Sequence, residues 1–496
     1  MAQERLLNKK YVISEVDLAG NHIADYIKSN NSSKSHRIDL VVCSTITSQN
    51  TSLTPLKVSK DKKKLNYIKN VIEIFLPVGY PNSVTADYLS YQIFDSLQAF
   101  SSSIAGMITS RAILEGIGVG DSTASPTSAL LLSVMQESVG RLGTIIFADR
   151  LGTSLEPECK MYRFAADIFN DTAMIIDCLS STFPKTWRLP LWCISSVLRS
   201  MCGVAAGSSK ASLSAHFAIQ NNLGELNAKD SSQETVISLL GMLAGSVILP
   251  YISSKWATWT TLIFLLCIHL GTNYLAVRSV CMRSFNRQRA NLFFSKVIHD
   301  LHAAKIVPIE TKEADLKKFI SSIILPSPQE ISRREKIFEQ DGILRWVDGT
   351  ALGRCKLGVS IKCILDCFGS SHSRTGSFSD LPSHLIQQLL LIYQKSNYIL
   401  YYDEPRKIHL VAMKSFIGNR TEVQLKAWIQ ALYLAKYRNI SDDEPLLKAL
   451  IRSRKFAECL VNAVFSCSNV REIGWDLEVS AMETNPSTRF VIKSCD

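Results

Sequence analysis

The sequence lacks the patterns that mark most soluble enzymes and nucleic-acid-binding proteins. No glycine-rich loop is followed by a lysine, and neither a catalytic-triad spacing nor a pair of catalytic carboxylates stands out. The net charge is +11, from 55 basic and 44 acidic residues, and no basic run alternates with aromatic residues. We therefore expect no enzymatic activity, no nucleic-acid partner, no cofactor and no metal site.

Repeated cysteine pairs and a signal peptide are also missing. The 13 cysteines are an odd number without repeated CxxC spacing, which argues against a disulfide framework and favours reduced thiols. The N-terminal segment has no uninterrupted apolar stretch, and Glu4, Glu15 and Asp17 argue against a transit peptide. Any membrane insertion is therefore expected to use an internal segment.

Two long runs without charge are the most informative part of the sequence. Residues 235–254 and 256–277 contain no Asp, Glu, Lys or Arg, and each run is long enough to cross a hydrocarbon layer of about 30 Å as a helix. Trp256 and Trp259 lie at the end of a run, where amphipathic rings prefer the lipid–water boundary. The pattern predicts a membrane hairpin; the alternative is a pair of buried helices in a soluble domain.

An arginine cluster without an acidic residue follows this hairpin. By the positive-inside bias, its end of the hairpin should face the cytosol. The cluster consists of Arg278, Arg283, Arg287 and Arg289.

The composition predicts one embedded and one soluble part, because 20% charged residues are too many for a chain that is membrane throughout. We expect a mainly α protein: a polytopic helical membrane-type domain of about six helices, followed by a smaller soluble α+β domain. The predicted parts are a polar, partly ordered N-terminal region (1–66), the helical domain (67–300), a linker (301–340) and the C-terminal domain (341–496).

Several predicted helices between residues 84 and 280 carry polar side chains on one face. Tyr91, Asp95 and Gln98 follow an i, i+4, i+7 spacing. Charged residues on apolar helices usually mark a binding site, a permeation path or a polar contact between helices. The remaining candidates are Glu137 and Arg141, spaced as an i, i+4 pair, Arg163, Asp167, Asn170 and Asp171 on one helix face, and the isolated charges Arg199 and Lys210.

Two GxxxG steps predict close helix packing, since glycine lets another backbone approach. They are Gly203 with Gly207, and Gly241 with Gly245.

The ends of the chain alternate strand-like and helix-like runs. Near the N-terminus, strands are expected at residues 11–16 and 38–45. In the C-terminal domain we expect strands at 355–364, 398–402, 407–413 and 489–493, and helices at 383–393, 421–437 and 444–463.

Six ordered strings over about residues 70–290 resemble the defining domain of the root UVB sensitive (RUS) family. They are LPVGYPNSVTADYLSYQIFDSLQA, AILEGIGVGD, YRFAADIFNDTAMIID, MCGVAAGSSKASLSAHFA, LNAKDSSQETVISLLGMLAG and LGTNYLAVRSV. The C-terminal region looks like the tail of the animal and fungal branch, so a non-plant member is expected.

The resemblance implies a membrane protein linked to vitamin B6 homeostasis, whose plant relatives also act in early development and form complexes. It carries over no catalytic residues. Besides residues already named, it adds these motif positions as candidates: Asp87, Lys229, Asp230, Gln233 and Glu234.

Three functional hypotheses remain open. The first is a protein of an intracellular membrane whose polar residues bind or transport a small anionic metabolite; a weak likeness to half of a major-facilitator transporter would require two copies. The second is a membrane scaffold that forms a homo- or hetero-oligomer with another RUS-family protein through its glycine steps. The third is a soluble enzyme with Lys210 or Lys229 as a Schiff-base lysine, for which no phosphate cup is visible.

Overall fold

The computed structural model describes the backbone of three N-terminal strands and most of the chain from residue 75 onward. The strands are β1 (Val12–Val16), β2 (His22–Ser29) and β3 (Arg37–Val41), which pair in the order β1-β2-β3. The other described residues are 75–117, 119, 126–306, 313–369, 378, 382–415, 418, 420–438, 445–485 and 488–492.

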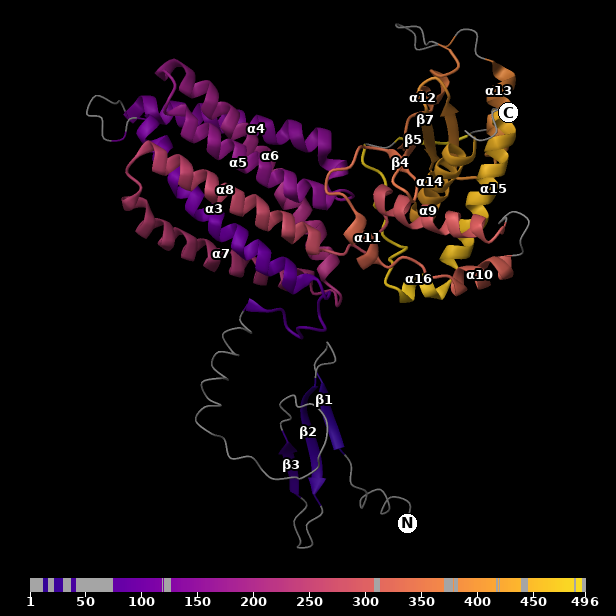
Figure 1. The fold of residues 1–496 in the computed structure, drawn as a ribbon, viewed down its shortest axis with the longest axis horizontal. Coiled ribbons are helices and arrows are strands. Elements are labelled where there is room, and N and C mark those ends of the chain that lie inside the picture. The colour runs from indigo at the N-terminus through magenta and orange to yellow at the C-terminus, as the bar shows by residue number, and fades with distance from the viewer. Residues whose placement is uncertain are drawn as a thin grey trace.

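The described part of the chain is mainly helical, as the sequence predicts. Long helices lie side by side in the first half and form a bundle (Figure 1). They are α3 (Tyr88–Ile117), α4 (Pro126–Leu151), α5 (Cys159–Ser180), α6 (Lys185–Phe217), α7 (Leu223–Ile248) and α8 (Lys255–Ser279), with the single turns η1 (Gly152–Ser154) and η2 (Leu249–Tyr251).

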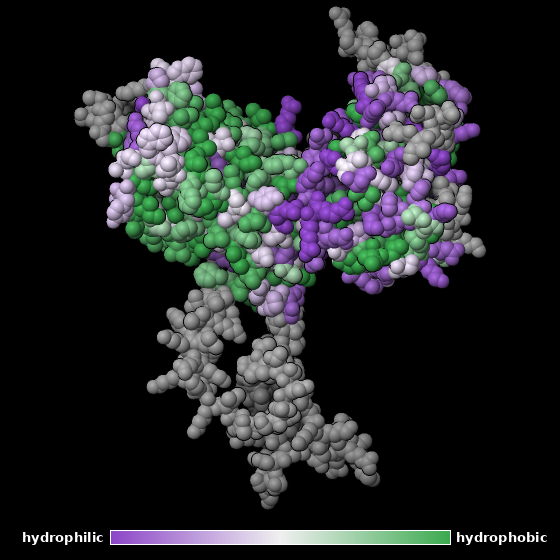
Figure 2. All heavy atoms as spheres, viewed as in Figure 1, coloured by the Kyte–Doolittle hydropathy of each residue, from purple (hydrophilic) through white to green (hydrophobic). Residues whose placement is uncertain are grey.

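The outside of the bundle is apolar. Large side chains such as Leu131, Ile145, Leu243 and Phe264 are more than half exposed, and hydrophobic residues cover most of the bundle face seen in Figure 2. Four of its helices, α4, α6, α7 and α8, are long and apolar enough to cross a membrane. Contact between so large an apolar surface and water would be unfavourable.

One of the two glycine steps is used inside the bundle. A Cβ atom at Gly241 would lie 2.7 Å from the Cβ of Ser103, and one at Gly245 would lie 2.7 Å from the sulfur of Met107, so both glycines let α7 approach α3 closely. A Cβ atom added at Gly203 or at Gly207 would have no described atom within 4 Å. Only the Gly203/Gly207 step therefore stays a candidate for contact with another chain.

The second half of the chain folds around a conventional apolar core. A mixed sheet has the order β4-β5-β7-β6, with the short β8 also pairing with β7, and α14 packs against it. The strands are β4 (Ile343–Arg345), β5 (Ala351–Leu357), β6 (Tyr398–Asp403), β7 (Ile408–Lys414) and β8 (Arg489–Phe490). The helices are α12 (Ile361–Leu365), α13 (Ser383–Ile392), α14 (Arg420–Tyr437), α15 (Leu446–Phe465) and α16 (Ser468–Glu472).

The expected linker at 301–340 is instead part of this core. The helices α9 (Arg287–Ala303), α10 (Glu313–Ser322) and α11 (Pro328–Arg334) bury Phe293, Ile320 and Ile331 against the same cluster as α14 and α15. Several charged residues that suggested a linker are exposed on these short helices: Asp315, Lys318, Glu330 and Arg333. We call residues 285–492 the C-terminal unit.

Two strand predictions need correction. The run at 355–364 ends as a strand at Leu357, because Ser360 caps α12 by accepting a hydrogen bond from the backbone N–H of Cys363. In the N-terminal region, the central strand β2 was not predicted, although β1 and β3 coincide with the expected runs; residues 42–45 of the second run lie outside the described part.

Candidate functional site

A network of polar side chains occupies the centre of the bundle, where α3, α5 and α8 meet. We call these residues the core network: Tyr91, Asp95 and Gln98 on α3, Arg163, Asp167 and Asp171 on α5, and His269 and Asn273 on α8.

Arg163 joins α5 to α3. Its Nη2 lies 2.6 Å from Oδ1 of Asp95, and its Nε donates a hydrogen bond to the Tyr91 hydroxyl at 3.2 Å. Both charged side chains of this ion pair are only 12% exposed. The i, i+4 spacing of Tyr91 and Asp95 thus presents two acceptors to one guanidinium.

Asp167 is the acceptor on which three helices converge. Its Oδ2 receives hydrogen bonds from the side-chain amides of Gln98 on α3 and Asn273 on α8. The amide oxygens of Gln98 and Asn273 are buried and accept no hydrogen bond within the described part of the chain. They remain available to a donor from outside the network.

His269 lies between two carboxylates. Its Nδ1 is 2.7 Å from Oδ1 of Asp171, and its Nε2 is 3.5 Å from Oδ2 of Asp167. The ring is only 2% exposed.

The core network holds an excess of negative charge. Three carboxylates face one guanidinium, so the net charge is two negative units with a neutral His269 and one with a protonated His269. Because an uncompensated buried charge is costly, the network favours a bound proton or a cationic group over an anion.

A second cluster lies where α6, α7 and α3 meet. Nζ of Lys210 is 2.7 Å from Asp230 and 2.8 Å from Glu234. Gln92 donates to Asp230 at 2.8 Å and to Gln233 at 3.1 Å. Lys210, an isolated charge in the sequence of its own segment, is therefore compensated by two acids of the neighbouring helix α7.

The other candidates are separated from these clusters. Asp87 binds His216 at 3.0 Å, and Arg199 binds the buried Asp177 at 2.6 Å. Glu137 and Arg141 form an ion pair at 3.1 Å on the exposed face of α4. Asn170 on α5 and Lys229 on α7 are half-buried.

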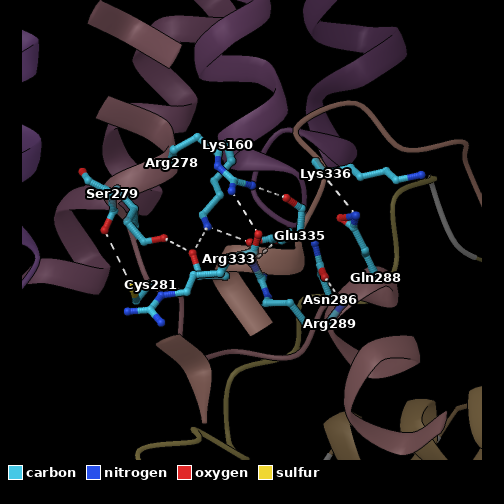
Figure 3. A network of polar contacts seen from close by, with 12 residues as sticks. Lys160, Arg278, Ser279, Cys281, Asn286, Gln288, Arg289, Arg333, Glu335 and Lys336 are labelled. Carbon is cyan, nitrogen blue, oxygen red and sulfur yellow. Dashed lines mark hydrogen bonds and ion pairs between the residues drawn. The ribbon is translucent and has the colours of Figure 1, made fainter. Parts of the chain in front are cut away.

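A third network ties the bundle to the C-terminal unit (Figure 3). The two carboxylate oxygens of Glu335, after α11, bind one cation each: Nζ of Lys160 on α5 at 2.6 Å and Nη1 of Arg289 on α9 at 2.9 Å. Arg278, at the end of α8, donates to the carbonyl oxygens of Glu335 and Arg333. Burial alone would raise the pKa of Glu335, but the charges of Lys160 and Arg289 hold it below its ordinary value.

This junction engages most of the arginine cluster, and the cytosolic orientation of that end stays a prediction. Arg289 forms an ion pair with Glu335, and Arg287 forms ion pairs with Glu158 at 3.2 Å and with Asp341 at 2.6 Å. Only Arg283 is exposed. The arginines that suggested a cytosolic face mainly hold the C-terminal unit against the bundle.

The two described cavities lie away from the core network. One of about 250 Å³ opens at the junction beside Glu158, Tyr162 and Asp341. The other, of about 460 Å³, lies beside Arg111 at the far end of the bundle. Among the described residues, no group of three or more His, Cys, Asp and Glu side chains is arranged to hold a metal ion.

Sequence reasoning missed several of the partners in these networks. His269 and Asn273 lie in the run that was assigned as a membrane helix because it has no charged residue. Their i, i+4 spacing places both polar side chains on one face of that helix, which could have marked them as candidates. Asp177 and His216 lie within the family-like strings, yet no local pattern distinguishes them. Lys160 and Glu335 are 175 residues apart and could not be paired without the fold.

Residues 61–300 match a family domain described as a vitamin B6 photo-protection and homoeostasis domain. RUS family member 1 of Dictyostelium discoideum is 40% identical over 279 residues, covering 56% of this chain and 49% of that protein. Protein root UVB sensitive 3 of Arabidopsis thaliana is 31% identical over 289 residues, covering 58% of this chain and 66% of that protein. No solved structure matches the chain.

The matched part of the chain spans about half of the amoebal relative and less than two thirds of protein root UVB sensitive 6 of Arabidopsis thaliana, which is 25% identical over 369 residues and covered to 64%. The 40% identity to a protein from outside the plants agrees with the expected non-plant branch. The domain match covers all six bundle helices and ends within α9.

Proposed function

This chain belongs to the root UVB sensitive family through its residues 61–300, and from that premise we propose that it is an integral membrane protein whose bundle binds and carries a small, vitamin B6-related metabolite. The observation that carries the proposal is a bundle with a polar interior and an apolar exterior. The proposal assigns no enzymatic step to the chain.

Aromatic residues at both ends of α8 support membrane insertion. Trp256 is 84% exposed and Tyr274 is 46% exposed, and they lie 18 residues apart on one helix. At a rise of 1.5 Å per residue this separation is about 27 Å, close to the thickness of a hydrocarbon layer. Trp187 and Tyr251 are also exposed, at the end of the bundle where Trp256 lies. Such rings are typical of the lipid boundary.

The core network supports binding of a particular class of ligand. Its excess negative charge and the unused amide oxygens of Gln98 and Asn273 favour a ligand that donates hydrogen bonds or carries positive charge. Among vitamin B6 forms, the amine and alcohol meet this requirement better than a phosphate ester does. The anionic metabolite expected from the sequence is therefore replaced in this proposal by an unphosphorylated form.

Uptake into proteoliposomes tests the proposal. We expect accumulation of labelled pyridoxamine or pyridoxine, and at least tenfold less accumulation of pyridoxal phosphate, in vesicles that contain the full chain. Asp167→Asn keeps the shape of the side chain but removes the charge at the centre of the core network, so it should lower uptake at least tenfold. Asp300→Asn, a carboxylate on α9 paired with Lys296, is the matched control and should leave uptake unchanged.

Two results would contradict this assignment. If no vitamin B6 form binds or accumulates, the transport proposal fails. If Asp167→Asn transports as well as the unmodified protein, the core network is not the binding site.

A membrane scaffold is the second candidate, and two observations favour it. The core-network side chains pack against one another away from the described cavities, as polar contacts that hold helices together do. The buried ion pairs of Glu335 also fix the C-terminal unit to the bundle. Here crosslinking in native membranes should recover soluble partners bound to residues 285–492, and the Asp167→Asn variant should recover the same partners.

A further inference from the structure

The outer face of α4 contains a feature that a lipid environment does not explain. Glu137 and Arg141 are 68% and 77% exposed and form their ion pair about ten residues from either end of the helix. Their neighbours are apolar and exposed: Leu130, Val134, Leu142 and Ile145. Charged residues in membrane helices almost always face protein or water.

The same face has the periodicity of a helix–helix seam. Leu130, Val134, Glu137, Arg141, Thr144 and Ala148 follow alternating steps of four and three residues. This spacing places them in one stripe along the helix, as in the contact line of a parallel helix pair. Within the chain, α4 packs mainly on α6 through the adjoining side of the helix, where Gly140 and Phe147 are buried.

We propose that this stripe of α4 is the contact surface with a second copy of the same chain. The inference rests on the proposed membrane insertion, because only there is the exposed ion pair expensive. A second copy fits because the charge pattern is self-complementary. A two-fold axis along the membrane normal sets each Glu137 between its own Arg141 and the Arg141 of the partner.

Charge complementarity selects a second copy over lipid as the occupant. Two Glu137 and two Arg141 side chains form a ring with no net charge, and the surrounding leucine and valine side chains exclude water from it. A lipid neighbour offers neither charge a partner. In a membrane, all copies insert in the same orientation, so the two α4 helices are parallel, and a seam of this spacing suits such a pair.

Charge reversal tests this contact. Glu137→Arg gives a ring of four positive charges, and Arg141→Glu gives a ring of four negative charges, so each variant alone should lose association at least tenfold. When the two variants are co-expressed with different tags, the mixed pair restores two charges of each sign, and the tags should co-purify as in the unmodified protein. The double variant Glu137→Arg with Arg141→Glu should also associate and shows that the helix still folds.

Cysteine crosslinking in intact membranes gives an independent measurement. Val134→Cys on the stripe should form a disulfide between copies, whereas Leu243→Cys, on the exposed face of α7, should not exceed the background of the native cysteines. Equal crosslinking at the two positions, or no rescue by the mixed charge variants, would overturn the proposal. Release of the chain by a carbonate wash would instead contradict membrane insertion itself.

Discussion

The bundle and the C-terminal unit differ in the side chains that they bury and in those that they expose. In the C-terminal unit, Trp428, Leu425 and Leu460 are fully buried in an apolar core. In the bundle, Asp167, Asp177 and His269 are buried, while leucines and isoleucines of α4, α7 and α8 are exposed. Figure 2 shows the change from one surface to the other along the molecule, with hydrophilic residues gathered where the two halves meet.

This difference indicates that the two halves are adapted to different surroundings. A core of leucines is stabilised by removal from water, and that gain disappears when lipid surrounds the helices. The bundle therefore depends on ion pairs, amide hydrogen bonds and close glycine contacts between helices. Replacement of a leucine by alanine should therefore lower the free energy of unfolding much more in the C-terminal core than on the outer surface of the bundle.

The largest expected effect is the loss of a buried ion-pair partner in the bundle. Asp95→Ala leaves the guanidinium of Arg163 without its carboxylate, and such a buried unpaired charge costs about 3–5 kcal/mol. Thermal unfolding of the full chain in detergent should show a lower melting temperature for the bundle. Asp95→Asn keeps an acceptor and should cost less; an equal loss in both variants would mean that geometry matters here and charge does not.

A matched pair of leucines sharpens the comparison. Leu460→Ala opens a cavity in the C-terminal core and should cost about 2–5 kcal/mol. Leu142, which is 60% exposed on α4, should change stability by about 0.5 kcal/mol or less when replaced by alanine. Thermal melting of the full chain in detergent measures both variants. Similar losses in both variants would argue against the opposite surroundings.

Acid should destabilise the C-terminal unit through a buried histidine. Burial lowers the pKa of His409 to about 4, while its Nδ1 donates to the carbonyl oxygen of Arg354. Because the folded pKa lies below the unfolded value of about 6.5, stability is full above pH 6.5 and is lost as the pH falls towards 4. The shift corresponds to about 3 kcal/mol. His409→Gln should flatten this pH dependence in unfolding measurements; an unchanged slope would assign it to other groups.

Glycine substitutions give the smallest effect. Gly241→Ala forces α7 away from Ser103 and Phe100 of α3 and should cost about 1–3 kcal/mol. Gly203→Ala meets no described atom and should stabilise α6 slightly, by about 0.5–1 kcal/mol, because alanine is the better helix former. Melting temperatures that fall equally in both variants would show that Gly203 also packs against a neighbour.

Much of the helical layout and six of the eight core-network residues could be predicted from the sequence. The face shared by Tyr91, Asp95 and Gln98, and the face of Arg163 and Asp167, follow from the 3.6-residue period of a helix. The contact between these two faces could not be predicted. The period of a helix shows which residues share a face, but it does not show which other helix that face contacts. The misassigned linker shows the same limit, since Ile320 and Ile331 become core residues only against α14 and α15.

Long apolar helices with polar stripes can be read from the amino-acid sequence alone, because periodicity and charge-free length are local properties. Only the tertiary structure decided which stripes close on one another: Asp167 with Asn273, Lys210 with Asp230, Lys160 with Glu335. It also separated the buried Gly241 from the open Gly203, and the paired faces of α5 from the unpaired face of α4. The physical reason is that an ion pair or a close helix contact depends on distance in space, which residues far apart in the chain acquire only when the helices pack.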